Sequence, residues 1–156
     1  QLPVAALTHF AHWLTPAGMK RRFATWFFVA KLPEGAVVSV DGEEMVEARW
    51  VRPQYAVAEH QAGNLRLPPP TVVSLMDLSQ HHSVDAAITA ARRRVPPYLF
   101  PKLCATDPEV IVMLYPGDAG YESGNRSVEG ARHRATWVDG VITYRRDFSF
   151  PDRDSP

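Results

Sequence analysis

The sequence predicts an α+β fold in a chain of 156 residues. Three short apolar segments, each closed by a proline, occupy the first third of the chain. Three segments with helical spacing follow, and then a buried apolar run and a hairpin pattern. Strands gathered before and after a block of helices are typical of α+β domains, whereas α/β domains alternate the two kinds of element. The length suits one domain of ordinary size.

The first three segments are expected to be strands at residues 8–16, 22–32 and 45–53. Proline ends each of them because it has no backbone N–H to donate to a neighbouring strand. The second segment contains the almost wholly apolar run Phe23 to Ala30, so it is predicted to be a strand buried on both faces. Together the three segments predict a mixed sheet.

The middle of the chain is expected to form three helices. In the first, at residues 54–64, Tyr55, Val57 and Ala58 are predicted to face inward. The second is entered through three prolines, with Thr71 either as its N-cap or one position inside it. The third has Ser83 as its N-cap and an acidic residue in its first turn, where the helix dipole favours an anion.

The last third is expected to return to strands. A proline-rich crossing leads to a buried strand at residues 110–118, and a polar, glycine-rich loop comes next. A hairpin is predicted from Arg134 to Phe148, with its turn at Asp139 and Gly140.

Composition excludes several classes of function. The 17 basic residues balance the 17 acidic ones, which argues against a protein that binds nucleic acid or a membrane surface through bulk charge. No apolar run approaches the roughly 20 residues of a membrane span. Cys104 is the only cysteine, so no internal disulfide can form, and the cytoplasm is the expected location.

Two groups of charged residues are candidates for a site. Arg21 and Arg22 precede the apolar second strand, where guanidinium groups can bind a phosphate or carboxylate, or can simply keep a strand edge soluble. Glu44 and Glu47 lie beside the start of the third predicted strand, where they are either solvated turn charges or ligands of a hard cation. The six histidines show no zinc-ligand spacing, and Cys104 is interpreted as a packing residue.

Four motifs in succession resemble the Nudix hydrolases, in the branch close to the coenzyme A diphosphatases. The similarity extends over about residues 8–78, half of the chain. Its motifs are Trp13-Leu14-Thr15-Pro16, the run Arg21 to Phe28, Trp50-Val51-Arg52-Pro53 and Pro69-Pro70-Thr71.

The resemblance implies a fold and an activity. It implies that residues 1–95 are the C-terminal part of a mixed Nudix-type sheet with flanking helices, an α/β/α sandwich. Residues 96–150 would form a C-terminal extension with a strand and a hairpin, and residues 151–156 a disordered tail. The implied activity is hydrolysis of a nucleoside diphosphate linked to another moiety, with coenzyme A or acyl-coenzyme A derivatives favoured and Mg²⁺ or Mn²⁺ as cofactor. Arg21 and Arg22 would contact the substrate diphosphate, and Glu47, more weakly, would serve a metal or a base role.

The chain departs from the family at the metal-binding signature, the Nudix box. The box should precede the first strand, yet seven residues precede Thr8, and the chain contains no Arg-Glu dipeptide. Ala24 also stands where relatives commonly carry an aspartate. The box is therefore expected upstream or on a partner chain, a reading that the first residue, Gln1, favours. The alternative is a non-catalytic module that binds a nucleotide or a protein. An incomplete sheet would also expose an edge that favours self-association.

Overall fold

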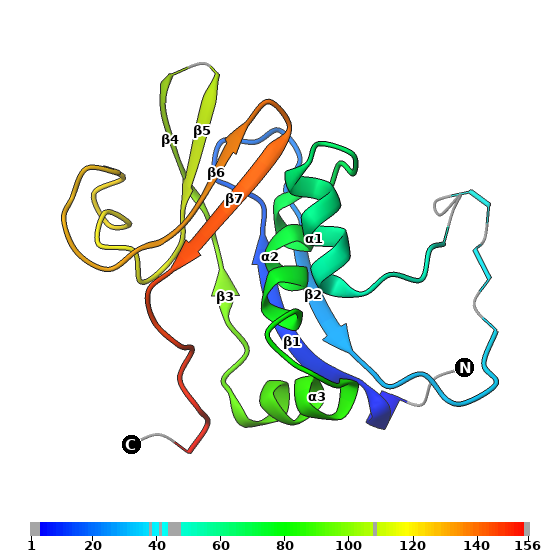
Figure 1. The fold of residues 1–156 in the computed structure, drawn as a ribbon. Helices are drawn as coiled ribbons and strands as arrows, with labels where there is room; N and C mark the ends of the chain where they lie inside the picture. The colour runs from blue at the N-terminus through cyan, green and yellow to red at the C-terminus, as the bar shows by residue number, and fades with distance from the viewer. Residues whose placement is uncertain (1–3, 38, 41, 44–47, 108, 155–156) are drawn as a thin grey trace.

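The computed structural model describes residues 4–37, 39–40, 42–43, 48–107 and 109–154. It confirms an α+β fold with three α-helices, a mixed three-stranded sheet and an antiparallel four-stranded sheet within these residues (Figure 1). None of the described helices has the length and hydropathy that crossing a bilayer requires. The elements are β1 (Thr8–Leu14), β2 (Ala24–Val29), α1 (Pro53–Gln61), α2 (Pro69–Leu78), α3 (Val84–Arg93), β3 (Tyr98–Leu99), β4 (Lys102–Asp107), β5 (Val110–Leu114), β6 (His133–Val138) and β7 (Val141–Arg146).

In the three-stranded sheet, β1 lies between its two neighbours. It pairs antiparallel with β2 and parallel with β3, where His12 lies opposite Tyr98. The prediction that the second strand is buried on both faces is wrong. Phe27 contributes to the core, but Trp26 is 57% exposed and β2 is an edge strand among the described residues. The exposed ring of Trp26 stacks on the ring of His9 in β1 instead, with the two ring centroids 4.7 Å apart.

The third predicted strand is not formed in the part that the structure describes. Its residues 45–47, which include Glu47, and the preceding Glu44 lie outside the described residues. Residues 48–52 belong to no strand, and Trp50 is 78% exposed. A segment becomes a strand only when it exchanges backbone hydrogen bonds with another strand, and these residues belong to neither of the described sheets.

The three predicted helices are present. Thr71 lies inside α2, whose N-cap is Pro68, and Ser83 caps α3 by accepting a hydrogen bond from the backbone N–H of Ala86 at 3.1 Å. The predicted inward face of α1 is wrong, because Ala56 and His60 are buried there. Tyr55 is 61% exposed. A polar anchor at His60, rather than an apolar stripe, orients this helix.

The four-stranded sheet has the order β4-β5-β6-β7. The predicted hairpin is confirmed as β6 and β7, whose turn residues Asp139 and Gly140 both have positive φ, 49° and 83°. Such a turn matches the twist of the flanking strands. The proline-rich crossing contains β3 and β4, which the sequence did not predict.

One hydrophobic core joins the two sheets and two of the helices. Its members come from β1, α2, α3, β3, β5, β6 and β7 and from the residue after β5. The boundary proposed at residue 95 remains a prediction, as does the α/β/α layering. Part of the tail expected to be disordered is hydrogen-bonded to the end of α3, where the N–H of Val95 donates to Pro151 O at 2.9 Å. The buried residues of the hydrophobic core that joins the two sheets are Phe10, Ala11, Trp13, Val72, Val73, Ala91, Leu99, Met113, Tyr115, Ala135 and Ile142.

Candidate functional site

The turn between β1 and β2 positions the two candidate arginines. Thr15 closes this turn: its backbone N–H donates to Phe23 O, and its hydroxyl oxygen accepts from the N–H of Phe23, both at 3.0 Å. Gly18 supplies a φ of 88° within the turn, a conformation that glycine adopts without strain. Arg21 and Arg22 therefore lie together and exposed at the end of the hairpin.

Arg22 is held by neutral groups. Its Nε donates to Thr15 O at 3.4 Å, and its guanidinium lies 5.4 Å from the ring centroid of Phe100. Within the described part of the chain no carboxylate neutralises it. An unpaired guanidinium at the surface can bind an anion through two parallel hydrogen bonds.

An apolar cavity of about 450 Å³ opens beside this turn. It lies between the turn, the end of β1, the prolines that open α2 and one face of the four-stranded sheet. Cavities of this size with apolar and aromatic walls are typical of small-molecule sites. The wall residues are Trp13, Leu14, Thr15, Pro16, Met19, Phe23, Thr25, Phe27, Pro68, Pro69, Pro70, Thr71, Pro101, Leu103, Ile111, Met113, Tyr115 and Trp137.

Two buried polar groups belong to the cavity wall. Trp13 is 3% exposed and Tyr115 is fully buried, and neither the indole Nε1 nor the phenol oxygen has a hydrogen-bond partner among the described residues. Burial raises the pKa of Tyr115, so its hydroxyl stays protonated. A buried donor without a partner costs about 1–3 kcal/mol, so these two groups do not stabilise the fold by hydrogen bonding.

The sequence pointed to one side of this cavity only. Thr15, Phe23 and Pro69 belong to the motifs that suggested a site, whereas Leu103 and Trp137 come from strands far along the chain. Proximity between residues about a hundred positions apart is not encoded in local spacing. The facing wall was therefore missed.

The predicted metal site remains a prediction. Glu44 and Glu47 lie outside the described residues. Among the residues that are described, no cluster of three or more His, Cys, Asp or Glu side chains could hold a metal ion. The described residues alone therefore do not supply the several converging oxygen ligands that Mg²⁺ or Mn²⁺ requires.

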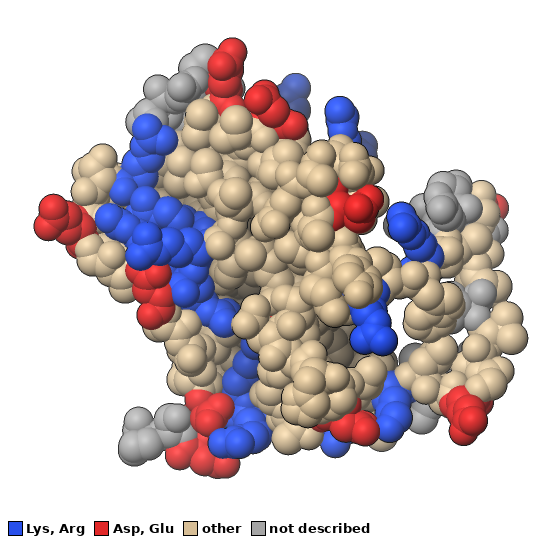
Figure 2. Space-filling view, in the orientation of Figure 1, with Lys and Arg blue, Asp and Glu red and all other residues tan. Residues whose placement is uncertain are grey.

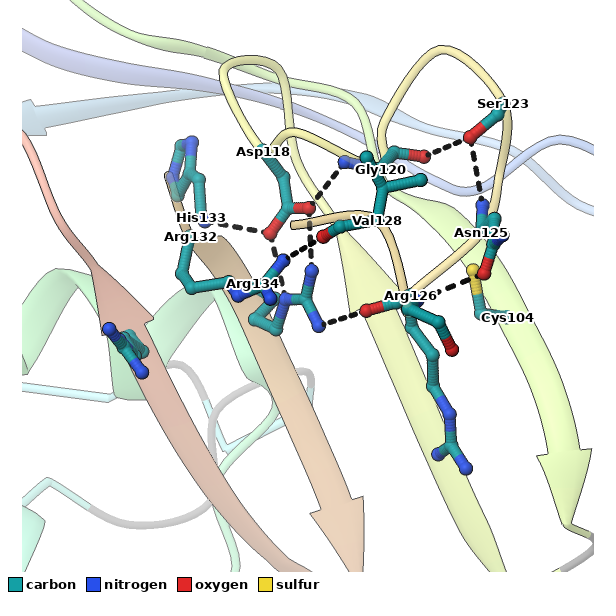
Figure 3. Close-up of polar contacts among 12 residues, drawn as sticks. Cys104, Asp118, Gly120, Ser123, Asn125, Arg126, Val128, Arg132, His133 and Arg134 are labelled. Atoms are coloured by element: carbon teal, nitrogen blue, oxygen red, sulfur yellow. Dashed lines mark hydrogen bonds and ion pairs between the residues drawn. The ribbon is translucent and has the colours of Figure 1, made fainter. Parts of the chain in front are cut away.

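A second polar centre surrounds Asp118, which lies near the start of the loop between β5 and β6 (Figure 3). Its two carboxylate oxygens accept from Arg134, at 2.7 and 2.8 Å, and from the backbone N–H groups of Gly120 and His133, each at 2.9 Å. Burial alone would raise the pKa of Asp118, but these hydrogen bonds lower it to about 2. A carboxylate so fully engaged is not available as a general base, and its role is to hold the loop.

Cys104 lies against the same loop and is 6% exposed. Its Sγ donates to Gly124 O at 2.7 Å (Figure 3). The interpretation of this cysteine as a packing residue agrees with its position.

A third group of charges forms where α2, α3 and β7 end. Asp77 accepts from both Arg94 and Arg146, and Arg94 also donates to Phe10 O at 3.2 Å. Figure 2 shows Lys and Arg side chains along the side of the molecule where β7 ends and the C-terminal segment runs. Through Asp77 the group links α2 to the end of α3 and to β7, and Asp77 neutralises part of its positive charge.

Comparison with known proteins identifies relatives over part of the chain. The chain is 32% identical over 114 residues to a protein of Caenorhabditis elegans named "Putative nudix hydrolase 7", which covers 72% of this chain and 38% of that protein. It is 34% identical over 82 residues to the acyl-coenzyme A diphosphatase NUDT19 of Homo sapiens, which covers 51% of this chain and 22% of that enzyme. The chain thus spans well under half of the length of either relative. No family model matches the chain, and no solved structure matches it.

Proposed function

We propose that this chain, a distant homologue of the Nudix hydrolases over part of its length, is the C-terminal part of a diphosphatase. Its substrate would be a nucleoside diphosphate linked to another moiety, with coenzyme A or an acyl-coenzyme A favoured. The observation that carries the proposal is the similarity to two Nudix hydrolases, one of them named as an acyl-coenzyme A diphosphatase.

The geometry of the β1–β2 turn supports this proposal. A diphosphate carries two or more negative charges, and Arg21 and Arg22 present two exposed cations at the edge of an apolar cavity. In the proposed role they bind the diphosphate and orient it. The intact protein would complete the Nudix-type sheet and its α/β/α layering, act in the cytoplasm and bind neither nucleic acid nor a membrane.

The metal is a separate matter. The described donors do not fit Mg²⁺ or Mn²⁺. We therefore assign no catalytic step to a metal held by these residues. The cofactor, with its ligands supplied from outside the described residues or by a partner chain, remains part of the proposal, as does the weaker role of Glu47.

Hydrolysis by two forms of the protein tests the proposal. The 156-residue chain and the product of the longest reading frame that contains it would be assayed on coenzyme A, an acyl-coenzyme A and ADP-ribose, with Mg²⁺ and with EDTA. We expect Mg²⁺-dependent cleavage of the coenzyme A substrates by the longer product and none by the 156-residue chain. The diphosphatase proposal is refuted if the longer reading frame encodes no Arg-Glu-x-x-Glu-Glu helix and its product cleaves none of the three substrates.

A non-catalytic module is the second candidate. The absence of a metal-binding cluster from the described residues favours it. In that case the arginines would hold a nucleotide or an acidic partner without cleaving it. Calorimetry separates the two, because a module binds coenzyme A or ADP-ribose with the same affinity whether or not Mg²⁺ is present and releases no product.

A further inference from the structure

We infer that the apolar cavity beside the β1–β2 turn is an acyl-chain site, a pocket for a hydrocarbon chain whose anionic head lies at Arg22. The inference deepens the proposed function, because it assigns the acyl part of the substrate to one cavity, and it rests on that function only for the identity of the rest of the substrate. Binding of the chain itself requires neither a metal nor a diphosphate.

The wall of the cavity selects an apolar ligand. Its side chains are hydrocarbon, aromatic or proline, apart from three threonines. The hydroxyl oxygen of Thr15 already accepts a hydrogen bond from the backbone of Phe23. The polar atoms of Trp13 and Tyr115 are buried behind the surface of the wall. A sugar or a nucleobase would leave most of its donors and acceptors unpaired here, whereas an alkyl chain leaves none.

The edge of the cavity selects an anionic head. Thr15 lines the cavity, and its carbonyl oxygen accepts from Arg22. The guanidinium also lies over Phe100, next to the wall residue Pro101. A carboxylate or a phosphate attached to a chain in the cavity would meet this cation, which no described carboxylate neutralises. The combination of an apolar interior with a cation at the edge fits an amphipathic acyl compound.

Exposed apolar residues show that the cavity is open to such a ligand. Phe23 is 66% exposed, Met19 is 52% exposed and Leu103 is 44% exposed, and all three line the cavity. Large apolar side chains exposed together mark binding sites more often than isolated ones do. A bound chain would remove these side chains from water, which drives the association.

Calorimetry of the 156-residue chain with octanoate, decanoate and 1-decanol tests the inference. We expect all three to bind, with the affinity rising about fourfold for each added CH₂ group, the ratio that corresponds to about 0.8 kcal/mol. Arg22→Ala should weaken decanoate several-fold and leave 1-decanol unchanged, since the alcohol carries no charge. Failure of both decanoate and 1-decanol to bind overturns the inference.

Cavity-filling variants locate the bound chain. Leu103→Trp and Ile111→Phe should each weaken decanoate at least tenfold, whereas Val84→Trp should have no effect, because Val84 is an exposed apolar residue on α3 that does not line the cavity. Far-ultraviolet circular dichroism would establish that each variant is folded. Equal affinity of the wild type and both filled variants places the ligand elsewhere and overturns the inference.

Competition separates a free fatty acid from an acyl-coenzyme A. Decanoyl-coenzyme A should displace decanoate strongly, whereas coenzyme A without an acyl group should compete only weakly, because it shares with decanoate the contact to Arg22 but not the cavity. If the intact protein hydrolyses decanoyl-coenzyme A but the chain binds no decanoate, the acyl-chain site fails and the diphosphatase stands. If decanoate binds as expected but the intact protein hydrolyses nothing, the diphosphatase fails and the acyl-chain site stands.

Discussion

At the scale of single residues, the ion pair between Asp118 and Arg134 is the strongest candidate for a stabilising contact. The carboxylate of Asp118 is fully buried, and the side chain of Arg134 is 16% exposed. Arg134 also donates to Arg126 O at 2.9 Å, so the pair connects the two ends of the loop that covers Cys104 (Figure 3). Removing one partner of a buried pair leaves the other charge without compensation.

We predict that Asp118→Asn lowers the free energy of unfolding by about 3–5 kcal/mol, because the Arg134 guanidinium would then stay buried and unpaired. Asp147→Asn is the matched control. Its pair with Arg145 is solvent-exposed, and such a pair contributes little to the stability of the fold. Urea denaturation of both variants measures the difference. A loss below about 1 kcal/mol for Asp118→Asn would contradict the prediction that the buried ion pair stabilises the fold.

Two tyrosines, Tyr115 buried and Tyr121 half-buried, give opposite expectations for the same substitution. Tyr115 has no hydrogen-bond partner for its hydroxyl among the described residues, so Tyr115→Phe should leave the stability unchanged or raise it by up to about 1 kcal/mol. The hydroxyl of Tyr121 donates to Phe100 O at 2.8 Å, so Tyr121→Phe should cost about 1 kcal/mol. Thermal unfolding compares them, and equal losses would mean that the Tyr115 hydroxyl has a partner after all.

At the scale of elements, local signals and long-range contacts differ in how well the sequence revealed them. The β6–β7 turn and the Ser83 cap depend on neighbouring residues, and both were predicted correctly. The burial of β2 and the inward face of α1 depend on elements far away in the chain, and both predictions were wrong. In α1 the decisive contact is polar, through His60, so apolar periodicity could not show it.

His60 connects α1 to β7. Its Nδ1 donates to Leu65 O at 2.9 Å, and its Nε2 accepts from the backbone N–H of Ile142 at 2.9 Å, an arrangement that only the neutral ring can make. We predict that His60→Leu lowers the free energy of unfolding by about 3 kcal/mol, because the buried N–H of Ile142 and the part-buried carbonyl of Leu65 lose their partner.

The control for this substitution is His82→Leu, since His82 is exposed and should change the stability by less than about 0.5 kcal/mol. Hydrogen exchange gives an independent measurement. The amide of Ile142 should lose protection in His60→Leu, while the amides of α3 should keep theirs when the variant and the wild type are compared at equal free energies of unfolding. Unchanged protection at Ile142 would contradict the proposed connection.

At the scale of the whole molecule, the sequence was sufficient for the fold class and for one half of the candidate site. The motifs around Thr15 and Pro69 identified the turn and the helix entry that line the cavity. The other half comes from Leu103, Ile111 and Trp137, which reach the cavity only because β3 pairs with β1 and leads the chain into the second sheet. Topology, not local pattern, brings the two halves together.

We expect acid to lower the stability of the molecule in two stages, one linked to His133 and one to Asp118. His133 is almost fully buried, with Nδ1 donating to Pro116 O at 2.6 Å. Burial, the largest influence, lowers the pKa of His133 from 6.5 to about 4. The folded state therefore binds this proton less readily than the unfolded state. The stability linked to His133 is fully present above pH 6.5 and is lost as the pH falls to about 4.

Asp118 responds at lower pH. Its pKa falls from 3.8 to about 2 on folding, so its contribution is present above pH 3.8 and is lost between that value and about pH 2. At about 1.4 kcal/mol for each pKa unit, the first stage amounts to about 3 kcal/mol and the second to about 2 kcal/mol.

Urea denaturation across the range from pH 7 to pH 3 tests this response, because the midpoint concentration follows the free energy of unfolding. We predict that His133→Asn is less stable than the wild type at pH 7 but loses much less stability between pH 6.5 and pH 4, since asparagine binds no proton there. His82→Asn, at an exposed position, should follow the wild-type curve throughout. If the free energy of unfolding falls in parallel with pH for the wild type and His133→Asn, groups other than the His133 imidazole cause the loss of stability in acid.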